Sequence, residues 1–472
     1  MKTFGSIQPS AVQDFLRDLV QADRPPAPGP RFDTVTDDLA QLGLTAGRPV
    51  LVALPNGRDF VTVVFALLAQ GAVPVLLPPS APPSRIERMA RALGADVLLA
   101  PRVPPGPGPG EPPLTVGGTV QSAFLHGVPA RRYRPGEIVL LTSGTSGVFS
   151  GCLHRVESLL LNASRHAHAI GQTAADRVLI NLPLHYSYAF VAQLLATLVS
   201  GGRAVVTGPP FTPARHARTL QDHRITVSSL TPALTAAWLG TGRPLPAPLR
   251  ALTVGGDLLD AASVAHLRER NPDLELYLTY GLTEAGPRVA TLAAHREPPH
   301  RHTSVGLPLP GVDVRLRPAQ PGDAVGELIV ETDTGMLRRV GHPDEPAPPT
   351  DGTRTSLATG DLFRRDDDGY LYFHSRRPTY VISRGEKVSL RSVCAVAETL
   401  PGVLGAQAWP YRNDAGDTVF TLDVYCADAS ADEREIRRRL ADVLLRSEQP
   451  ARLLVHPAAQ LGWRKSVAKE RS

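Results

Sequence analysis

The most chemically suggestive stretch of the chain is rich in hydroxyls and glycines, and it follows a short apolar run, residues 138–141. The run predicts a buried strand. Glycines let backbone N–H groups turn toward one point, and Ser and Thr hydroxyls add donors without bulk. The stretch is therefore a candidate phosphate-binding loop, although a tight turn without a ligand is the alternative. It does not follow the Walker pattern, because no Gly-Lys-Ser/Thr follows. Its candidate phosphate ligands are Thr142, Ser143, Gly144, Thr145 and Gly147.

Two later segments support the interpretation of this stretch as a phosphate-binding loop. They read Tyr-Gly-Leu-Thr-Glu-Ala at residues 280–285 and Thr-Gly-Asp-Leu at residues 359–362. With the loop, and in this order, they resemble the signature motifs of the adenylate-forming superfamily: acyl-CoA synthetases, stand-alone adenylation domains of peptide assembly lines, and luciferases. The family loop usually reads Thr-Ser-Gly-Thr-Thr-Gly-x-Pro-Lys-Gly, and here Phe149 and Ser150 replace Pro and Lys. The resemblance covers nearly the whole chain.

The resemblance implies an α/β fold in two domains. Residues 1–376 would form a large AMP-binding domain of parallel and mixed sheets, with helices and a β-rich subdomain. Residues 377–472 would form a small, mobile α+β lid. In the family this lid swings between one pose for adenylation and another for acyl transfer, a hinge-type closure that rebuilds the site between half-reactions.

The local sequence pattern agrees with this fold class. Residues 49–54 and 73–77 are apolar, and residues 60–70 between them have helical spacing. Such a strand–helix–strand unit is typical of parallel strands joined by a right-handed crossover. Residues 304–308 and 326–330 are expected to form short strands and turns of the β-rich subdomain, as the family has here.

The resemblance also implies a nucleotide site. The turn after the apolar run 251–254 matches the family's adenine-contacting turn, and the aromatic ring at position 280 would stack on adenine. The carboxylate at position 361 would accept the ribose hydroxyls, as acidic residues do in other nucleotide sites. The arginine at position 376 matches a second ribose or phosphate contact. The expected AMP-binding residues outside the loop are Gly256, Asp257, Tyr280, Gly281, Thr283, Asp361 and Arg376.

Glu284 is the candidate magnesium ligand. The α-phosphate of ATP and the substrate carboxylate are both anionic, so their approach is opposed by Coulomb repulsion. Magnesium typically uses one or two protein carboxylates plus phosphates, and it relieves that repulsion. The resemblance assigns this role to Glu284, with Thr145 as a second catalytic residue, whereas the alternative is an exposed glutamate without a ligand. The implied cofactors are ATP/AMP and Mg²⁺, with CoA or phosphopantetheine as the thiol.

The acid-binding residues are expected beside the segment 183–188. The family places an aromatic or histidine cluster here, and Tyr186 occupies the usual histidine position. The alternative is that these aromatics simply pack at the start of a helix. By the resemblance, His185, Tyr186, Tyr188 and Arg288 lie near the acid, and their polarity favours a small polar or aromatic acid. Gly385 would line the path of a pantetheine arm, where only a small side chain lets it pass.

The C-terminal region departs from the family pattern. Pro378 replaces the usual hinge residue, and its ring fixes φ and restricts the residue before it. Residues 390–392 replace the family's helix-opening Pro-x-Glu. The closing Gly-Lys, whose lysine bridges carboxylate and α-phosphate, aligns with Gly462 and Trp463. Either Lys465 substitutes for that lysine, or adenylation is slow, or the chain no longer performs it.

The bulk properties narrow the class of protein. A chain of 472 residues is too long for one core. Its net charge of +5 comes without a basic block interleaved with aromatics, so nucleic acid is not an expected partner. The cysteines, Cys152, Cys394 and Cys426, lack the spacing of a metal site or a disulfide framework. Without a signal segment or an 18-residue apolar run, a cytoplasmic protein with no membrane span is expected.

The leading hypothesis is an ATP-dependent ligase, in specialised metabolism, that activates a small carboxylic acid as an acyl-adenylate. The acyl group would pass to CoA, to the thiol of a carrier protein or to an amine. A second hypothesis keeps the fold but transfers a preformed acyl group without adenylation. A third is a non-catalytic partner in a biosynthetic assembly. A branch of the family that activates nitrite to form diazo compounds also stays open.

Overall fold

The computed structural model of the chain contains two compact units. Unit 1 comprises residues 1–314, 330–355 and 366–372, and unit 2 comprises residues 315–329, 356–365 and 373–472. The structure describes residues 9–23, 31–103, 114–129, 131–141, 151–318, 322–341, 347–376, 380–383, 386–413, 418–427 and 432–457.

The first sheet of unit 1 has parallel pairing from β1 through β13, whereas β14 and β15 are antiparallel to their neighbours. Its central parallel strands are almost wholly buried, which fits strands covered on both faces. Among the described residues its spatial order is β1 (Val20–Gln21), β10 (Arg203–Val206), β9 (Arg177–Ile180), β11 (Val227–Leu230), β12 (Ala251–Gly255), β13 (Glu275–Gly281), β14 (Arg288–Ala293) and β15 (Leu307–Pro308).

The second sheet of unit 1 is mixed. β2, β3, β4 and β7 run parallel, and the predicted strand–helix–strand unit of residues 49–77 is confirmed by β2, the helix α3 and β3. The outer strands are antiparallel. In the described part of the chain the order is β18 (Arg338–Val340), β8 (Gly151–Arg155), β7 (Glu137–Leu141), β3 (Val73–Leu76), β2 (Pro49–Val52), β4 (Val97–Ala100), β6 (Val120–Phe124) and β5 (Thr115–Val116).

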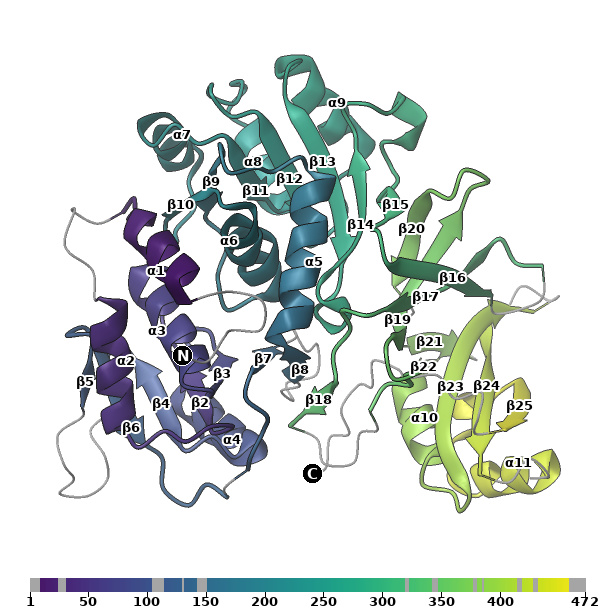
Figure 1. The fold of residues 1–472 in the computed structure, drawn as a ribbon. Coiled ribbons are helices and arrows are strands. Elements are labelled where there is room, and N and C mark those ends of the chain that lie inside the picture. The colour runs from purple at the N-terminus through teal and green to yellow at the C-terminus, as the bar shows by residue number, and fades with distance from the viewer. Residues whose placement is uncertain are drawn as a thin grey trace. The chain divides into compact units, whose positions relative to one another are not determined.

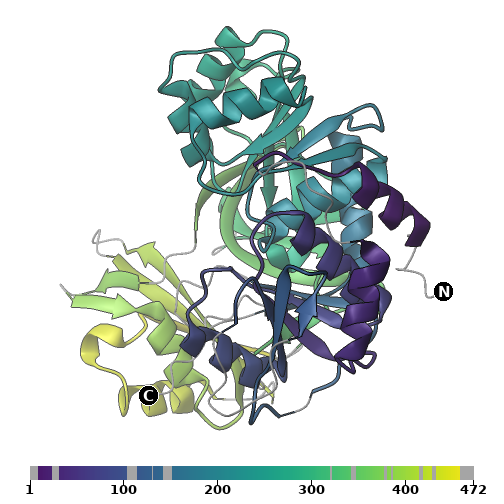
Figure 2. The ribbon, with the colours of Figure 1, turned by 90° about the vertical axis from the view of Figure 1, so that its left-hand side faces the viewer.

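The helices of unit 1 pack against these sheets. α1, α2 and α3 lie side by side (Figures 1 and 2), and α3 is buried from Phe60 to Leu68 because nearly all of its residues are apolar. No helix in the described ranges is long and apolar enough to span a bilayer. The bounds in unit 1 are α1 Pro9–Asp18, α2 Phe32–Gln41, α3 Arg58–Ala69, α4 Pro83–Leu93, α5 Val156–Ala169, α6 Ala196–Ser200, α7 Pro213–Asp222, α8 Pro232–Leu239 and α9 Ala261–Arg270, with a π-helix η1 Tyr188–Leu195 and 3-10 turns η2 Thr283–Ala285 and η3 Pro299–Arg301.

Unit 2 is built on smaller sheets, and the boundary between the units runs through β16, β17 and β20. Its elements are the four-stranded sheet β16 (Val312–Pro318), β17 (Val325–Thr332), β19 (Thr355–Arg365) and β20 (Leu371–Arg376), the pair β21 (Tyr380–Ser383) and β22 (Glu386–Ser389), the three-stranded sheet β23 (Val403–Arg412), β24 (Thr418–Cys426) and β25 (Arg452–Pro457), the helices α10 (Leu390–Ala397) and α11 (Glu433–Ala441), and the 3-10 turn η4 (Arg446–Glu448).

One strand prediction is wrong in part. The expected strand at residues 326–330 lies within β17 of the four-stranded sheet. The expected segment at residues 304–308 divides between two sheets. Gly306 forms an isolated antiparallel bridge with Leu371 of β20, whereas residues 307–308 form β15, which pairs with β14 at the edge of the first sheet. The partner of so short a segment depends on contacts far along the sequence, which local pattern does not carry.

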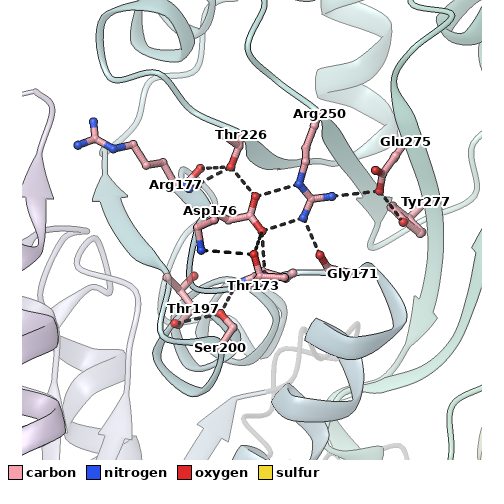
Figure 3. A network of polar contacts seen from close by, with 12 residues as sticks. Gly171, Thr173, Asp176, Arg177, Thr197, Ser200, Thr226, Arg250, Glu275 and Tyr277 are labelled. Carbon is pink, nitrogen blue, oxygen red and sulfur yellow. Dashed lines mark hydrogen bonds and ion pairs between the residues drawn. The ribbon is translucent and has the colours of Figure 1, made fainter.

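The amino edge of the first sheet, where its parallel strands begin, is held by a polar network (Figure 3). Arg250 is its centre: Nε and Nη2 donate to the two carboxylate oxygens of Asp176 at 2.9 and 2.7 Å, and Nη1 donates to Glu275 Oε2 at 3.0 Å. Thr226 and Tyr277 donate further hydrogen bonds to these carboxylates. Hydrogen bonding to Asp176 raises the pKa of Arg250. This network ties together the starts of β9, β11, β12 and β13.

Candidate active site

Four of the predicted nucleotide-binding residues of unit 1 meet at the carboxyl edge of the first sheet. Gly256 and Asp257 follow β12, and Tyr280 and Gly281 end β13, its parallel neighbour. In open α/β sheets, ligands bind outside the carboxyl ends of the strands. The structure therefore brings two motifs that lie apart in the sequence to one edge, opposite the polar network of Arg250.

Two glycines at this edge have no room for a side chain. A Cβ at Gly255 would collide with Thr279 Oγ1 and lie 3.2 Å from the Tyr188 hydroxyl. A Cβ at Gly281 would collide with the carbonyl of Pro287. Gly256 has φ of +91°, a conformation that favours glycine. Close packing thus accounts for the glycines at positions 255 and 281, and backbone conformation accounts for Gly256.

Glu284 lies in the turn η2 directly after β13, and it is fully buried. Its Oε1 accepts a hydrogen bond from Arg339 Nη2 at 2.5 Å, and the Arg339 side chain is only 3% exposed. Its backbone carbonyl accepts from Met336 N at 2.8 Å. The alternative of an exposed glutamate is therefore wrong: Glu284 is half of a buried ion pair.

Sequence reasoning missed Arg339. This residue lies on β18 of the second sheet, where it pairs in register with Cys152 of β8. It is 55 residues away from Glu284 along the chain. The adjacent arginines at positions 338 and 339 of this three-residue strand are a local hint, but they do not identify the partner.

Tyr188 and Arg288, two of the predicted acid-binding residues, are in contact. The Arg288 guanidinium lies over the Tyr188 ring, with its carbon 4.2 Å from the ring centroid. Its Nη1 donates to Thr279 Oγ1 at 2.8 Å. The Tyr188 hydroxyl lies 3.1 Å from Thr253 Oγ1. Tyr188 is also the first residue of the π-helix η1, and such helices are frequent at functional sites.

The backbone of Arg288 is fixed by Asn162 of α5, which lies beside β14 (Figure 1). Asn162 Nδ2 donates to the Arg288 carbonyl and Asn162 Oδ1 accepts from the Arg288 N–H, both at 2.9 Å. One helical turn further, His166 is fully buried. Burial lowers the pKa of His166 to about 3, and the charge of Arg288 lowers it further. Asn162 and His166 were also missed, because buried polar residues on an amphipathic helix give no signal of what they face.

The other two acid-binding candidates lie differently. The Tyr186 side chain is exposed, and its ring is 4.3 Å from that of His185. Burial lowers the pKa of His185 to about 4, so it is neutral at pH 7. Between them and η1, Ser187 Oγ lies 2.7 Å from Thr283 Oγ1. This hydrogen bond links the aromatic segment to the Tyr280–Glu284 motif.

The comparisons with known proteins agree with this arrangement. A model of the AMP-binding enzyme family matches residues 32–338. This chain belongs to the AMP-binding enzyme family. That membership confirms the predicted resemblance to the adenylate-forming superfamily.

Three of the similar proteins illustrate the range of the family. The chain is 30% identical, over 86% of its length, to phenyloxazoline synthase MbtB of Mycolicibacterium paratuberculosis, and it spans 36% of that protein. It is 27% identical to the salicyl-AMP ligase / salicyl-S-ArCP synthetase of Mycobacterium tuberculosis, over 80% of this chain and 72% of that enzyme. The structure of O-succinylbenzoate Coenzyme A Synthetase from Bacillus subtilis in complex with AMP matches with a TM-score of 0.66 and 19% identity, over 98% of this chain and 99% of that one. The last comparison confirms the predicted α/β fold class.

The predicted ribose-binding residues of this AMP-binding enzyme lie in unit 2. Asp361 of β19 is buried, and its Oδ1 accepts from Arg376 Nε at 2.9 Å. The Arg376 side chain is two-thirds exposed. The Thr359 hydroxyl, donating to the Leu328 carbonyl and accepting from the Asp361 N–H, holds this turn in place. The two residues that the resemblance assigns to the ribose therefore contact each other.

The donor type at Glu284 fits magnesium, which binds hard oxygen ligands and often takes only one or two protein carboxylates. No group of three or more His, Cys, Asp or Glu side chains suited to a metal occurs in the ranges that the structure describes. Arg339 already holds Oε1 of Glu284. The residues present thus fit a cation that takes most of its oxygen ligands from a bound phosphate, and that shares Glu284 with a guanidinium.

Several predicted site residues lie outside the described residues. β7 and β8 are paired from Glu137–Arg155 to Leu141–Gly151, and the candidate phosphate loop connects them. The strand expected before the loop is thus confirmed. The predicted residues outside the described ranges are Thr142, Ser143, Gly144, Thr145, Gly147, Gly385 and Lys465, together with Pro378 and Trp463.

Proposed function

We propose that this AMP-binding enzyme activates a carboxylic acid with ATP as an acyl-adenylate, releases pyrophosphate, and transfers the acyl group to a thiol or an amine in specialised metabolism. The observation that carries the proposal is the convergence of Gly256, Tyr280 and Glu284 at one edge of the first sheet. The printed names of the similar proteins, which include a salicyl-AMP ligase and a Coenzyme A synthetase, support the same reaction class.

In this proposal different residues of the chain bind different parts of the nucleotide. Tyr280 and the turn at Gly256 and Asp257 hold the adenine, and Asp361 with Arg376 holds the ribose. Gly281 and Thr283 complete the AMP contacts. The glycine- and hydroxyl-rich loop holds the phosphates through Thr142, Ser143, Gly144, Thr145 and Gly147.

The chemical step brings a substrate carboxylate oxygen to the α-phosphorus while pyrophosphate leaves. A magnesium ion held by Glu284 would supply positive charge between the two anions. Thr145 donates a hydroxyl toward the phosphates, and Lys465 supplies a cation to the carboxylate and α-phosphate in place of the lysine that Trp463 replaces. Removing such a preorganised donor typically costs about 10²- to 10³-fold in rate.

The acceptor is proposed to be CoA or the phosphopantetheine thiol of a carrier protein, with an amine as the alternative. Gly385 would leave room for the slender thiol arm. The match to a synthetase whose name includes S-ArCP supports a carrier protein as partner.

The test is ATP–pyrophosphate exchange with labelled pyrophosphate over a panel of carboxylic acids, with and without Mg²⁺. Acid-dependent exchange that requires Mg²⁺ is expected. Lys465→Ala should lower exchange by about 10²-fold, whereas the matched variant Lys469→Ala should leave it near wild type. Equal effects of the two substitutions would remove Lys465 from the mechanism, and absence of exchange with every acid would remove adenylation.

Two observations favour a second candidate function, acyl transfer without adenylation. The charge of Glu284 is already compensated by Arg339 within the protein, and Trp463 replaces the usual lysine. Both features reduce the charge that the chain could supply to the adenylation step, because Glu284 is already paired and the usual lysine is replaced. Transfer of acyl groups from synthetic acyl-adenylates to CoA in the absence of ATP, together with silent exchange, would support this alternative.

A further inference from the structure

Arg288 is a buried cation at the carboxyl edge that has no acidic partner among the described residues. The whole residue is only 2% exposed, so its side chain is buried. Nη1 donates to the Thr279 hydroxyl, and Nε has no hydrogen-bond partner. Among the residues that the structure describes, no carboxylate forms an ion pair with it. Its side chain therefore makes one hydrogen bond to a neutral group and stacks on one ring.

Such burial is unfavourable in the free protein. A charged side chain taken out of water is costly unless it is paired, and a guanidinium can donate five hydrogen bonds. Burial lowers the pKa of Arg288, and the Tyr188 ring only partly opposes it. The nearest titratable group on α5, His166, is neutral at pH 7 and adds no negative charge. Within the described part of the chain, no negative charge therefore balances Arg288.

The position of the cation is nevertheless well defined. Asn162 holds its backbone through two hydrogen bonds, and its guanidinium carbon lies 4.2 Å from the centroid of the Tyr188 ring. Tyr188 in turn is fixed by Thr253 and lies against Gly255 and Gly256. A group held this closely without a counter-ion is typical of a binding residue whose partner arrives with the ligand.

We propose that Arg288 binds a second carboxylate on the acid substrate, so that the enzyme prefers dicarboxylic acids of which one carboxylate is activated. This rests on the proposed function, in which the acid lies beside the Tyr188 segment. A planar guanidinium matches a carboxylate through two parallel hydrogen bonds, which a neutral amide or ester does not reproduce. The hydroxyls of Thr279 and Tyr188 next to it suit the same polar end of the ligand.

The test is a calorimetric titration of the purified full chain with pairs of acids that differ only in the second charge. The pairs are glutaric acid with 4-carbamoylbutanoic acid, and isophthalic acid with 3-carbamoylbenzoic acid, each with and without AMP. Wild type should bind a diacid at least about 30-fold more tightly than its half-amide, as expected for a buried charge pair. Arg288→Met should abolish this preference, and Arg288→Lys should keep part of it.

Arg218→Met, an identical change at an exposed arginine of α7, is the matched control and should behave as wild type. Circular dichroism confirms that each variant is folded. Equal affinity of wild type for diacid and half-amide, or failure of both diacids to bind, would overturn the inference. So would a loss of AMP affinity in Arg288→Met with the preference for diacids unchanged, since Arg288 would then serve the nucleotide.

The same titrations separate this inference from the proposed function. A charge preference that depends on Arg288, together with silent pyrophosphate exchange, supports diacid binding by Arg288 and removes adenylation. Exchange that proceeds equally with diacids and half-amides supports adenylation and overturns the inference.

Discussion

At its amino edge the first sheet buries much of Arg250 between two carboxylates, whereas at its carboxyl edge it buries Arg288 against a hydroxyl and a ring. Arg250 donates to Asp176, Glu275 and a backbone carbonyl (Figure 3), and its pKa is raised by hydrogen bonding to Asp176. The pKa of Arg288 is lowered by burial. The same type of side chain, an arginine, thus stabilises the fold at one edge, whereas at the other edge it is proposed to bind a ligand.

The difference shows how charge balance distinguishes a structural arginine from a binding one. A network whose donors and acceptors are matched within the protein gains from being buried, because each charge is paired. A buried donor without a partner gains only when a ligand completes it. Arg339 at the carboxyl edge is an intermediate case, since its partner Glu284 is also the residue proposed to meet the metal.

The largest effect is expected at Arg339. Arg339→Met leaves the fully buried Glu284 without its cation, and the free energy of unfolding should fall by about 3 to 5 kcal/mol. The double variant Glu284→Gln/Arg339→Met should recover much of the loss, because no charge is left uncompensated. Urea unfolding measures both. The single variant Glu284→Gln is measured as well. If the effects of the two single substitutions simply add in the double variant, the pair is not coupled.

Arg250→Met should cost somewhat less, about 3 kcal/mol, because its own side chain keeps contact with solvent while Asp176 does not. Thermal and urea unfolding of the variant measure the loss. Adding Asp176→Asn should restore part of the stability. An Arg250→Met protein as stable as wild type would break the comparison between the edges, since the network would then be dispensable.

Acid should destabilise the protein through its buried neutral histidines, of which His216 lies on α7. Burial lowers the pKa of His216 from 6.5 to about 4. Between these two pKa values the unfolded chain binds a proton at His216 and the folded chain does not. The free energy of unfolding therefore falls as the pH falls from about 6.5 toward 4. His216→Phe should therefore reduce the loss of stability between pH 7 and pH 5 by about 2 kcal/mol. His126→Phe, at an exposed site, is the control, and an identical pH profile in both variants would contradict the expectation.

The smallest effect on stability is expected at Arg288, and its sign is opposite. Arg288→Met removes an unpaired buried charge and should leave the ligand-free protein equally stable or more stable by about 1 kcal/mol. Urea unfolding without ligand tests this. A loss of 3 kcal/mol or more would mean that Arg288 is a structural arginine like Arg250.

The sequence predicted the elements whose signals are local. The apolar runs at residues 49–54 and 73–77 and the helix between them were confirmed as β2, α3 and β3, since period and turn chemistry act over a few residues. The placement of residues 307–308 was wrong, because strand pairing is decided by a partner elsewhere in the chain.

The candidate site divided in the same way. Gly256, Tyr280 and Glu284 were recognised through short motifs, and the fold places them together at one edge. Arg339 and Asn162 carry no motif, and their contacts with Glu284 and Arg288 join residues on separate elements. The boundary predicted at residue 376, the roles of the site residues and the identity of the acid remain predictions.

In directed evolution of substrate scope, position 281 should stay glycine, whereas neighbouring positions of the acid site can be varied. Any larger residue there would overlap the carbonyl of Pro287, so randomising this codon should return glycine in every folded clone. Position 288, one residue beyond that carbonyl, carries a side chain whose removal we expect the fold to tolerate. Libraries aimed at new acids should therefore diversify positions 188 and 288 and leave codon 281 untouched.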